Sequence, residues 1–518
     1  MCCGRRPIRK RSTGDIYKTT RLAKYDSKDG CMVRQMMEKL QSSLSGGRRH
    51  GRNREVAVIT YGFLCLFMAM ALYFVCFMLF FAEDFINSPY NARLSHFSDR
   101  VVRGDIFSAD GKLLATTVTD NSGGETRSYP YGNEYAHAVG YAVKGMAGAE
   151  LEANFHLLRS HSFFTEKIIN DINETKNQGD AAVLTIESEL QDCAYYNMGG
   201  YNGAVVAVEP STGKILCLLS KPDFDPNTIA ANWESITGDP SSSVLLNRAT
   251  QGLYPPGSTF KIITALAYLA DGGKLTDTYD CEGVLSYEDD GEDATFHCYK
   301  NTAHGHEDFK EAIGNSCNCA FAEIGLTLKA DRLRSLCAQL LFNDRIPTTL
   351  KNVKKSAFVL TDRDDAAMKM QTAFGQGETL AVPMHMAMIV AAIANDGELM
   401  RTYDIDRIQN SNGSTVRVFA PRYAGTILTK EQAATARMLM RYVVTDGTGG
   451  DLNVDRYTAY GKTGTAEYND AKDAHSWFIG YAEKDGRKIA LAVVMEGAGS
   501  GSGHALPLAK RLFDTYFK

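Results

Sequence analysis

The chain has 518 residues, enough for two or three domains that each bury a core of their own. Its hydrophobic, aromatic and charged fractions of 44%, 10% and 23% are ordinary for a folded protein and exclude a wholly disordered chain. The net charge of −5 is unevenly distributed, because residues 1–54 hold 15 Lys and Arg against 4 Asp and Glu.

Residues 56–82 form a run of 27 residues without a charged side chain. A helix that rises about 1.5 Å per residue needs about 20 apolar residues to cross a bilayer, so we predict one transmembrane helix here. A cleaved signal peptide would have a shorter apolar core and a small-x-small cleavage site, which "FFA" does not supply. Four arginines precede the run and two acidic residues follow it, so we expect residues 1–55 in the cytoplasm and the remainder outside the cell.

The basic tail could also suggest a nucleic-acid partner. Its charges are spread among polar residues with no aromatic or helical pattern, and membrane orientation together with attraction to anionic lipid explains them. The outer portion of the chain is acidic, which argues further against such a partner. We expect no nucleic-acid binding.

Beyond the membrane segment the chain divides into two predicted domains. Residues 83–199 alternate short apolar runs with turn signals such as Asp110-Gly111, which predicts a strand-rich, non-catalytic, membrane-proximal domain. An amphipathic helix over 184–198 leads into a second domain over 200–518.

The second domain has strand patterns at both ends and helical patterns between them. Two apolar strands within 203–220 flank a turn at 210–213. Helical patterns follow at 261–270, 309–328 and 385–395, and strands return before an amphipathic helix at the end of the chain. This order predicts an α+β fold, with one antiparallel sheet flanked by helices on both faces.

Two Ser-x-x-Lys pairs occur in this domain. Ser211 and Lys214 lie across the turn, where a spacing of three does not stack side chains, so we interpret that pair as structural. Ser258 and Lys261 begin an apolar helix, so the Lys261 amine can reach the Ser258 hydroxyl and, when neutral, take its proton. Apolar neighbours disfavour the charged amine, and helix-start amides can stabilise an oxyanion. The alternative is a capping serine with a solvated lysine.

Two further motifs would complete a site around Ser258. In "GNSCNCAF", Ser316 and Asn318 are alternate residues that can present a hydroxyl and an amide to one cleft. In "GKTGTAE" we expect an edge strand that carries Lys462, Thr463, Gly464 and Thr465, where Gly464 leaves room for a substrate backbone. Each triplet is weak alone, but the order S-x-x-K, S-x-N, K-T-G is a strong signal of serine acyl transfer.

This ordered set of motifs resembles the class B penicillin-binding proteins, which are peptidoglycan transpeptidases with a β-lactamase-like catalytic fold. The likeness runs from about Arg103 to the end and includes "RGDIFSADG", "LLNRATQGLYPPGSTFK", "FGQGE" and "KTGTAE". It implies that Ser258 is the acylated nucleophile and that Lys261 is its base. Ser316 would relay protons, and Asn318 would hold the substrate amide. Lys462, Thr463 and Thr465 would bind the substrate carboxylate, and the amides of Ser258 and Thr465 would form the oxyanion hole.

The resemblance also implies the reaction and its partners. Ser258 would attack the D-Ala-D-Ala bond of a peptidoglycan stem peptide, and an amine of a neighbouring stem would then take the acyl group. β-Lactams would mimic the first half and block the serine, and a lipid-linked glycan polymerase in the membrane is the expected partner. The rival functions are a D,D-carboxypeptidase or β-lactamase, a β-lactam sensor and a catalytically idle scaffold. The three intact motifs favour the transpeptidase, and residues 83–199 look too short for a glycosyltransferase domain.

Seven cysteines follow the predicted membrane segment, an odd number that cannot all pair within one chain. Cys281 and Cys298 bracket an acidic loop, with histidines close by. A disulfide between these two cysteines is our favoured interpretation. Reduced, inert thiols and a structural zinc site of Cys281, Cys298 and His306 are the alternatives. The serine chemistry requires no metal, so we expect no metal ion or other cofactor in the catalytic site.

Overall fold

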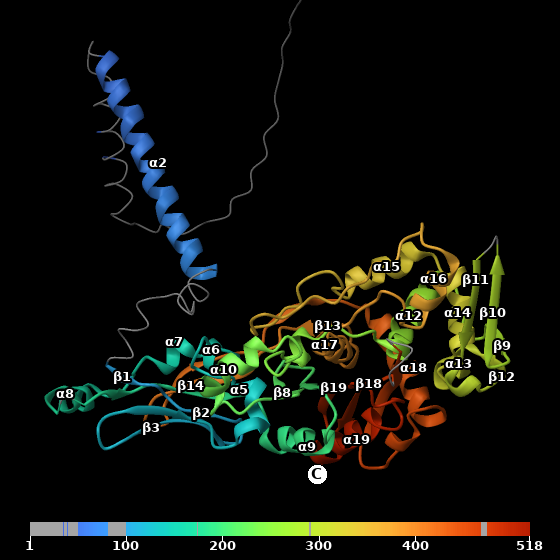
Figure 1. The fold of residues 1–518 in the computed structure, drawn as a ribbon. Coiled ribbons are helices and arrows are strands. Elements are labelled where there is room, and N and C mark those ends of the chain that lie inside the picture. The colour runs from blue at the N-terminus through green and yellow to red at the C-terminus, as the bar shows by residue number, and fades with distance from the viewer. Residues whose placement is uncertain are drawn as a thin grey trace, which may run out of the picture. The chain divides into compact units, whose positions relative to one another are not determined.

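The computed structural model describes residues 35, 39, 50–80, 100–173, 175–289, 292–467 and 474–518. The chain forms two units, residues 1–82 and 83–518 (Figure 1). In the first unit, α2 (His50–Phe80) includes 25 residues, Arg54–Met78, that are apolar enough and long enough to cross a membrane. The predicted span therefore coincides with one continuous helix. Residues 81 and 82 of that prediction, and most of the basic tail, lie outside the described residues.

The second unit is built on a five-stranded antiparallel sheet in the order β17-β18-β19-β7-β8 (Figure 1). Its strands are β7 (Gly203–Val208), β8 (Ile215–Lys221), β17 (Thr458–Ala466), β18 (His475–Lys484) and β19 (Arg487–Met495). Because β19 pairs with β7, the two ends of this part of the chain lie side by side. The predicted antiparallel sheet is confirmed, and β17, which carries the K-T-G motif, is its edge strand.

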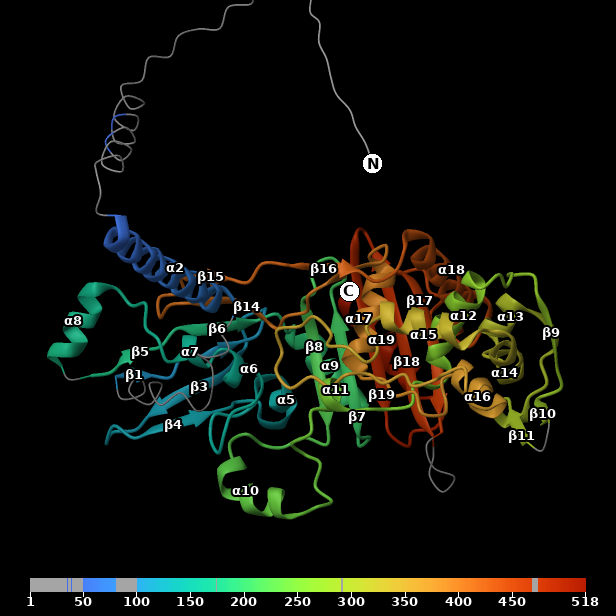
Figure 2. The same cartoon turned by 90° about the horizontal axis from the view of Figure 1, so that it is seen from above.

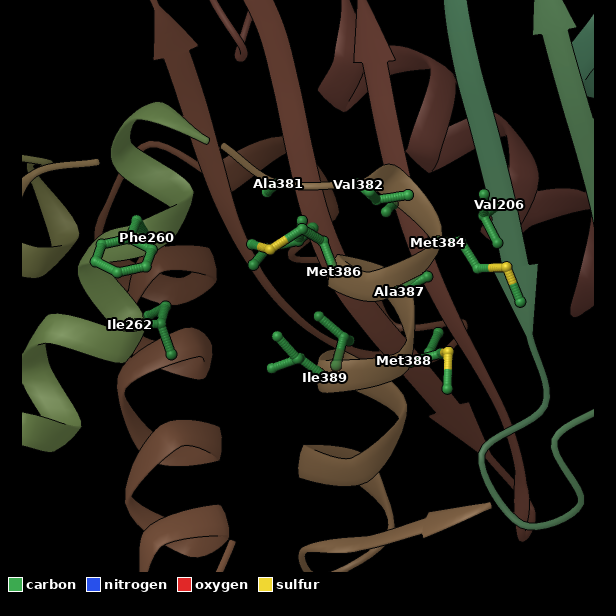
Figure 3. Close-up of a cluster of buried hydrophobic side chains, with 14 of the residues drawn as sticks. Val206, Phe260, Ile262, Ala381, Val382, Met384, Met386, Ala387, Met388 and Ile389 are labelled. Atoms are coloured by element: carbon green, nitrogen blue, oxygen red, sulfur yellow. The ribbon is translucent and has the colours of Figure 1, made fainter. Parts of the chain in front are cut away.

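Helices cover both faces of this sheet, as predicted. One face of the sheet packs against α17 (Pro383–Ala394). On the same side lie α11 (Arg248–Gln251), α12 (Lys261–Ala270) and α18 (Lys430–Asp446). The other face packs against α9 (Ser188–Met198) and α19 (Ala505–Tyr516). Every residue of α17 is buried, so this helix is the centre of the larger core. Figure 3 shows its Met386 and Met384 between Phe260, at the start of α12, and Val206 of β7.

A helical and β-hairpin region lies beside α12 in the second unit (Figure 1). Its helices are α13 (Phe309–Gly314), α14 (Asn318–Thr327), α15 (Ala330–Gln339) and α16 (Ala366–Ala373), and its strands are β9 (Thr278–Cys281), β10 (Val284–Asp289), β11 (Glu292–His297) and β12 (Gly305–Asp308). The strands β13 (Glu398–Met400) and β16 (Tyr423–Thr426) pair with each other in a separate sheet. The helix α10 (Ile229–Gly238) lies outside this region and packs against Phe224.

The single helix predicted over 309–328 is wrong. The structure divides it into α13 and α14, and Ser316 between them has a φ of 58°, in the left-handed region. The Cys317 sulfur accepts a hydrogen bond from the Ala320 amide and so caps a new helix start. The break falls at Gly314-Asn315-Ser316, residue types that are common at helix ends, whereas apolar residues on both sides of it favoured one long helix.

The membrane-proximal region has a sheet of its own, in the order β15-β14-β6-β2-β3-β4 (Figure 2). Its strands are β2 (Ile106–Phe107), β3 (Leu113–Thr119), β4 (Glu125–Ser128), β6 (Ala181–Leu184), β14 (Ile405–Gln409) and β15 (Thr415–Val418), and β1 (Val101–Val102) pairs separately with β5 (Asn177–Gln178). Strands β14 and β15 come from far along the chain, within the predicted second domain. The sequence analysis found neither this contribution nor the short helices α5 (Ala136–Val139), α6 (Gly148–Glu152), α7 (Asn154–Leu157) and α8 (Phe164–Ile172).

A buried carboxylate holds this region together. Glu150, on α6, is 0% exposed and forms ion pairs with Arg103 at 2.6 Å and with Arg127 at 2.7 Å. Burial alone would raise the pKa of Glu150, but the two guanidinium groups hold it below its ordinary value. The carboxylate is therefore ionised and fully paired.

Candidate active site

Ser258 lies in a single 3-10 turn, η2 (Gly257–Phe260), that leads directly into α12. Gly257 has a φ of 53°, and its amide donates a hydrogen bond to the Gly375 carbonyl at 2.9 Å. Thr259 and Phe260 behind the turn are buried, whereas Ser258 is partly exposed. The turn therefore leaves Ser258 partly accessible to solvent, at the helix start predicted from the sequence.

Lys261 lies one turn behind Ser258 and is 0% exposed. Its Nζ is 2.6 Å from the carbonyl oxygen of Ser316 and 2.7 Å from Oδ1 of Asn318, and Oγ of Ser316 is at 3.4 Å. Among the described residues no carboxylate forms an ion pair with this amine. Burial lowers the pKa of Lys261 to about 8. A neutral amine that donates its two N–H groups to the two close oxygens keeps a lone pair with which to accept a proton.

The break between α13 and α14 brings Ser316 and Asn318 to this amine. Because the backbone turns at Ser316, that residue and Asn318 both face Lys261, as their alternation suggested. The Asn318 side chain is engaged at both ends, since its Nδ2 donates to the carbonyl of His297 at 2.7 Å. In this structure the amide holds Lys261 and the end of β11 together.

Lys462 lies on β17 and is also 0% exposed. Its Nζ donates to Oγ of Ser316 at 2.8 Å and to the carbonyl of Thr463 at 3.0 Å. Burial, and then repulsion by Lys261, lowers the pKa of Lys462 well below its ordinary value. The amines of both buried lysines thus lie within hydrogen-bond distance of the Ser316 hydroxyl, so a proton can pass from one amine to the other through that hydroxyl.

The remainder of the K-T-G motif lines the edge of β17 next to Ser258. A Cβ atom on Gly464 would lie 2.8 Å from Cγ2 of Thr259, so only glycine fits between β17 and the turn. The hydroxyl of Thr463 is 2.7 Å from that of Thr448, and the amide of Gly501 donates to Oγ1 of Thr465 at 3.4 Å.

Thr448 and Gly501 were not predicted as site residues. Thr448 follows the C-terminus of α18, in the glycine-rich segment "DGTGG", and Gly501 belongs to "GAGSGSG", the connection between β19 and α19. A Cβ atom on Gly501 would lie 2.4 Å from the Gly464 carbonyl, so this loop packs directly on β17. The glycines were the available signal, because they permit such close backbone contact.

The other serine–lysine pair has a different environment. Ser211 is exposed in the turn between β7 and β8, and Nζ of Lys214 forms an ion pair with Asp406 at 2.8 Å. The ion pair with Asp406 is a structural role for Lys214, which agrees with the structural interpretation of this pair.

The cysteines expected beside the acidic loop lie together behind Asn318. Cys281 and Cys298 are free thiols with their sulfurs 3.6 Å apart, so the favoured disulfide is not formed in this structure. His306 is exposed and contacts Asp280 at 2.8 Å, whereas Nδ1 of His304 is 3.4 Å from the Cys281 sulfur. The histidine beside these thiols is therefore His304 rather than His306.

Two families match the chain, each over a separate region. Residues 203–514 match the penicillin binding protein transpeptidase domain, which covers more than half of the chain, and residues 103–182 match the penicillin binding protein A dimerisation domain. The chain belongs to the class B penicillin-binding proteins. A relative from Mycolicibacterium smegmatis, named peptidoglycan D,D-transpeptidase PbpA, is 32% identical over 88% of this chain and 96% of its own length.

Solved structures agree with this family assignment. Penicillin-binding protein A from M. tuberculosis, as a ceftriaxone acyl-enzyme complex, is 27% identical with a TM-score of 0.73, over 82% of this chain and all of that one. The D,D-transpeptidase domain of a peptidoglycan glycosyltransferase from Eggerthella lenta is 29% identical with a TM-score of 0.71, over 80% of this chain and 98% of that one. This class B penicillin-binding protein is a serine-type enzyme, anchored to a membrane through α2.

Proposed function

We propose that this protein cross-links peptidoglycan stem peptides through an acyl-enzyme on Ser258, and that β-lactams inhibit it by acylating the same serine. The observation that carries the proposal is the buried Lys261 amine. It has no carboxylate partner among the described residues, its pKa is lowered to about 8, and it lies one turn behind a partly exposed serine. The named activity of the M. smegmatis relative supports the same reaction.

In the first half of the reaction, the Lys261 amine takes the Ser258 hydroxyl proton while Oγ attacks the carbonyl carbon between the two D-alanines. Hydrogen bonds from the backbone amides of Ser258 and Thr465 would stabilise the oxyanion. When the C–N bond breaks, the leaving D-alanine nitrogen takes a proton that reaches it through Ser316, which contacts both lysines.

In the second half, an amine of a neighbouring stem peptide attacks the ester and loses its proton to the same network, which releases Ser258. Thr463 and Thr465, on the edge strand, would bind the substrate carboxylate, and Gly464 leaves space for the substrate backbone. The contacts of Asn318 and Lys462 favour positioning and proton transfer as their main roles.

The membrane anchor sets where this chemistry takes place. The excess of basic residues before α2 favours a cytoplasmic N-terminus, with residues 83–518 outside the cell. Because the stem peptides are attached to glycan strands made at the membrane, we expect a lipid-linked glycan polymerase as a partner, with α2 as the contact.

The experiment is an intact-mass measurement on the full chain in detergent after exposure to benzylpenicillin, with Ser258→Ala as the test variant and Ser211→Ala as the matched control. A persistent adduct is expected on the wild type and on Ser211→Ala, and none on Ser258→Ala. No adduct on folded wild-type protein would favour an idle scaffold. An adduct that disappears within seconds would favour a hydrolase.

A second measurement separates the transpeptidase from a D,D-carboxypeptidase. A stem-peptide substrate is supplied with and without a D-amino acid as acceptor amine, and the products are identified by mass spectrometry. Exchange of the terminal D-alanine is expected. Hydrolysis alone, at every acceptor concentration, would contradict the transpeptidase and favour the carboxypeptidase.

A further inference from the structure

Four metal-binding side chains converge behind the S-x-N motif. Cys281 ends β9, Cys298 follows β11, Cys317 caps α14, and His304 precedes β12. Their ligand atoms all lie within 4.8 Å of one another, and all three cysteines are at most 2% exposed. Figure 1 shows β9 to β12 and α14 gathered in one part of the fold, so the cluster joins the β9–β12 pair, the end of the β10–β11 hairpin and the start of α14.

The spacing of the ligand atoms fits a single tetrahedral ion. The Cys298 sulfur is 3.6 Å from that of Cys281 and 3.8 Å from that of Cys317, and Nδ1 of His304 is 3.4 Å from the Cys281 sulfur. A tetrahedron with zinc–sulfur bonds of about 2.3 Å and a zinc–nitrogen bond of about 2.0 Å has edges of roughly 3.5 to 3.8 Å. These three separations lie within about 0.2 Å of those edges, and the other separations are no longer than 4.8 Å.

Backbone donors surround the three sulfurs. The amides of Gly283, Asn318 and Ala320 donate hydrogen bonds, in that order, to the sulfurs of Cys281 at 3.4 Å, Cys298 at 3.3 Å and Cys317 at 3.4 Å. Such N–H donors stabilise thiolates, the form in which cysteine binds a metal, and they fix the direction of each ligand.

We propose that Cys281, Cys298, Cys317 and His304 bind one structural zinc ion. The set of three thiolates and one imidazole is a closed zinc site, with no position left for a catalytic water. Binding displaces the thiol protons to solvent, and His304 binds as the neutral imidazole through Nδ1. A [4Fe–4S] cluster fits less well, because each of its four cysteines binds a separate iron and the sulfurs would lie farther apart.

The zinc would hold part of the active site in place, a consequence that rests on the proposed function. Cys317 lies between Ser316 and Asn318, the two residues that contact the Lys261 amine. Asn318 is tied to the same cluster through its amide on the Cys298 sulfur and through its side chain on the His297 carbonyl. The metal would therefore position the base without taking part in the chemistry.

The test measures zinc by plasma mass spectrometry in the full chain, purified in detergent without chelators. The expected content is about one zinc per chain. It should be retained in Cys337→Ser, a buried thiol on α15, and in His306→Ala, two residues from His304. It should be lost in Cys298→Ser and reduced in His304→Ala. Zinc-free native protein would overturn the proposal, whether its thiols are free or Cys281 and Cys298 form a disulfide by peptide mapping. Zinc content unchanged in Cys298→Ser would overturn it as well.

A second readout needs only the wild type, in case Cys298→Ser does not fold. Replacement of the metal by Co²⁺ should give the intense near-ultraviolet absorption of thiolate-to-cobalt charge transfer, and alkylation of Cys281, Cys298 and Cys317 should occur only after chelation. Absence of that absorption would contradict thiolate ligation.

Benzylpenicillin acylation, measured before and after chelation, tests the link to the active site, and zinc removal should slow it. Acylation that is unchanged in zinc-free protein would overturn that link. Because zinc content and the Co²⁺ spectrum do not depend on acylation, a failure of the proposed function would be recognised separately.

Discussion

Two regions of the second unit, residues 83–518, bury charged side chains in opposite ways. In the membrane-proximal half, Glu150 is completely buried and bracketed by Arg103 and Arg127. In the other half, Lys261 and Lys462 are equally buried, but the hydrogen bonds of their amines go to hydroxyl, carbonyl and side-chain amide oxygens rather than to a carboxylate.

The difference distinguishes the charge of Glu150, which stabilises the fold, from the amine of Lys261, which can take part in catalysis. Pairing keeps Glu150 ionised and makes it a fixed support, whereas burial without an ion-pair partner among the described residues lowers the pKa of Lys261 to about 8 and makes its proton available. Burying an unpaired amine disfavours the folded state at pH values below about 8, a cost that a purely structural lysine would not carry.

The largest expected effect comes from making the Lys261 charge permanent. In Lys261→Arg the guanidinium stays protonated, so the rate of benzylpenicillin acylation should fall by about 10² to 10⁴-fold, the usual contribution of a general base. The measurement is the second-order acylation rate, with circular dichroism to confirm folding. Lys214→Arg, in the other Ser-x-x-Lys pair, is the control and should acylate at the wild-type rate. Equal losses in both variants would contradict the assignment of the base.

Removal of the paired charge of Glu150 should lower the stability of the fold and leave the rate of acylation unchanged. Glu150→Gln leaves two buried guanidinium groups without their carboxylate and should lower the free energy of unfolding by about 3 to 5 kcal/mol. Urea unfolding measures this loss, and the fraction that remains folded should acylate normally. Asp514→Asn removes a surface partner of Lys510 and should cost less than about 1 kcal/mol. A similar cost for both variants would show that burial of Glu150 contributes little.

The pH dependence of acylation tests the role of the unpaired Lys261 amine without any substitution. Because the neutral amine is the base and the pKa of Lys261 is about 8, the acylation rate should rise about tenfold per pH unit below that value and level off above it. The pH series of benzylpenicillin rates on the wild type gives the midpoint. A flat profile from pH 6 to 9 would indicate that Lys261 is not the titrating base.

The smallest effect is expected from a neutral contact. Thr448→Val removes the hydroxyl that meets Thr463, a loss of about 0.5 to 1.5 kcal/mol, or roughly 2- to 13-fold in acylation rate. Thr445→Val, one turn earlier and exposed, is the matched control. A loss as large as that of Lys261→Arg would mean that hydroxyl positioning, rather than the unpaired amine, dominates the site.

The sequence predicted those parts of the site that local spacing controls. The order of the three motifs, the helix start at Ser258 and the edge strand at Lys462 follow from patterns within a few residues, and the antiparallel sheet follows from the order of strands and helices. The left-handed residue at Ser316 was missed because apolar residues on both sides favoured one helix, although Gly314 and Asn315 before it are typical of a helix end.

The remaining differences come from contacts between distant segments. The Thr448 hydroxyl, the close approach of Gly501 to β17 and the choice of His304 over His306 depend on where separate loops meet in space. The strands β14 and β15 depend on it too, since they join a sheet whose other strands precede residue 185.

That shared sheet also constrains the order in which the chain folds during synthesis. Strand β6 (Ala181–Leu184) needs β14 (Ile405–Gln409) as a neighbour, so the sheet stays open along one side of β6 while the intervening catalytic residues are made. An open edge on an apolar strand invites pairing with other chains. A polypeptide that stops after residue 199 would carry this edge permanently. The membrane-proximal half is therefore first in the sequence but among the last parts of the protein to be completed.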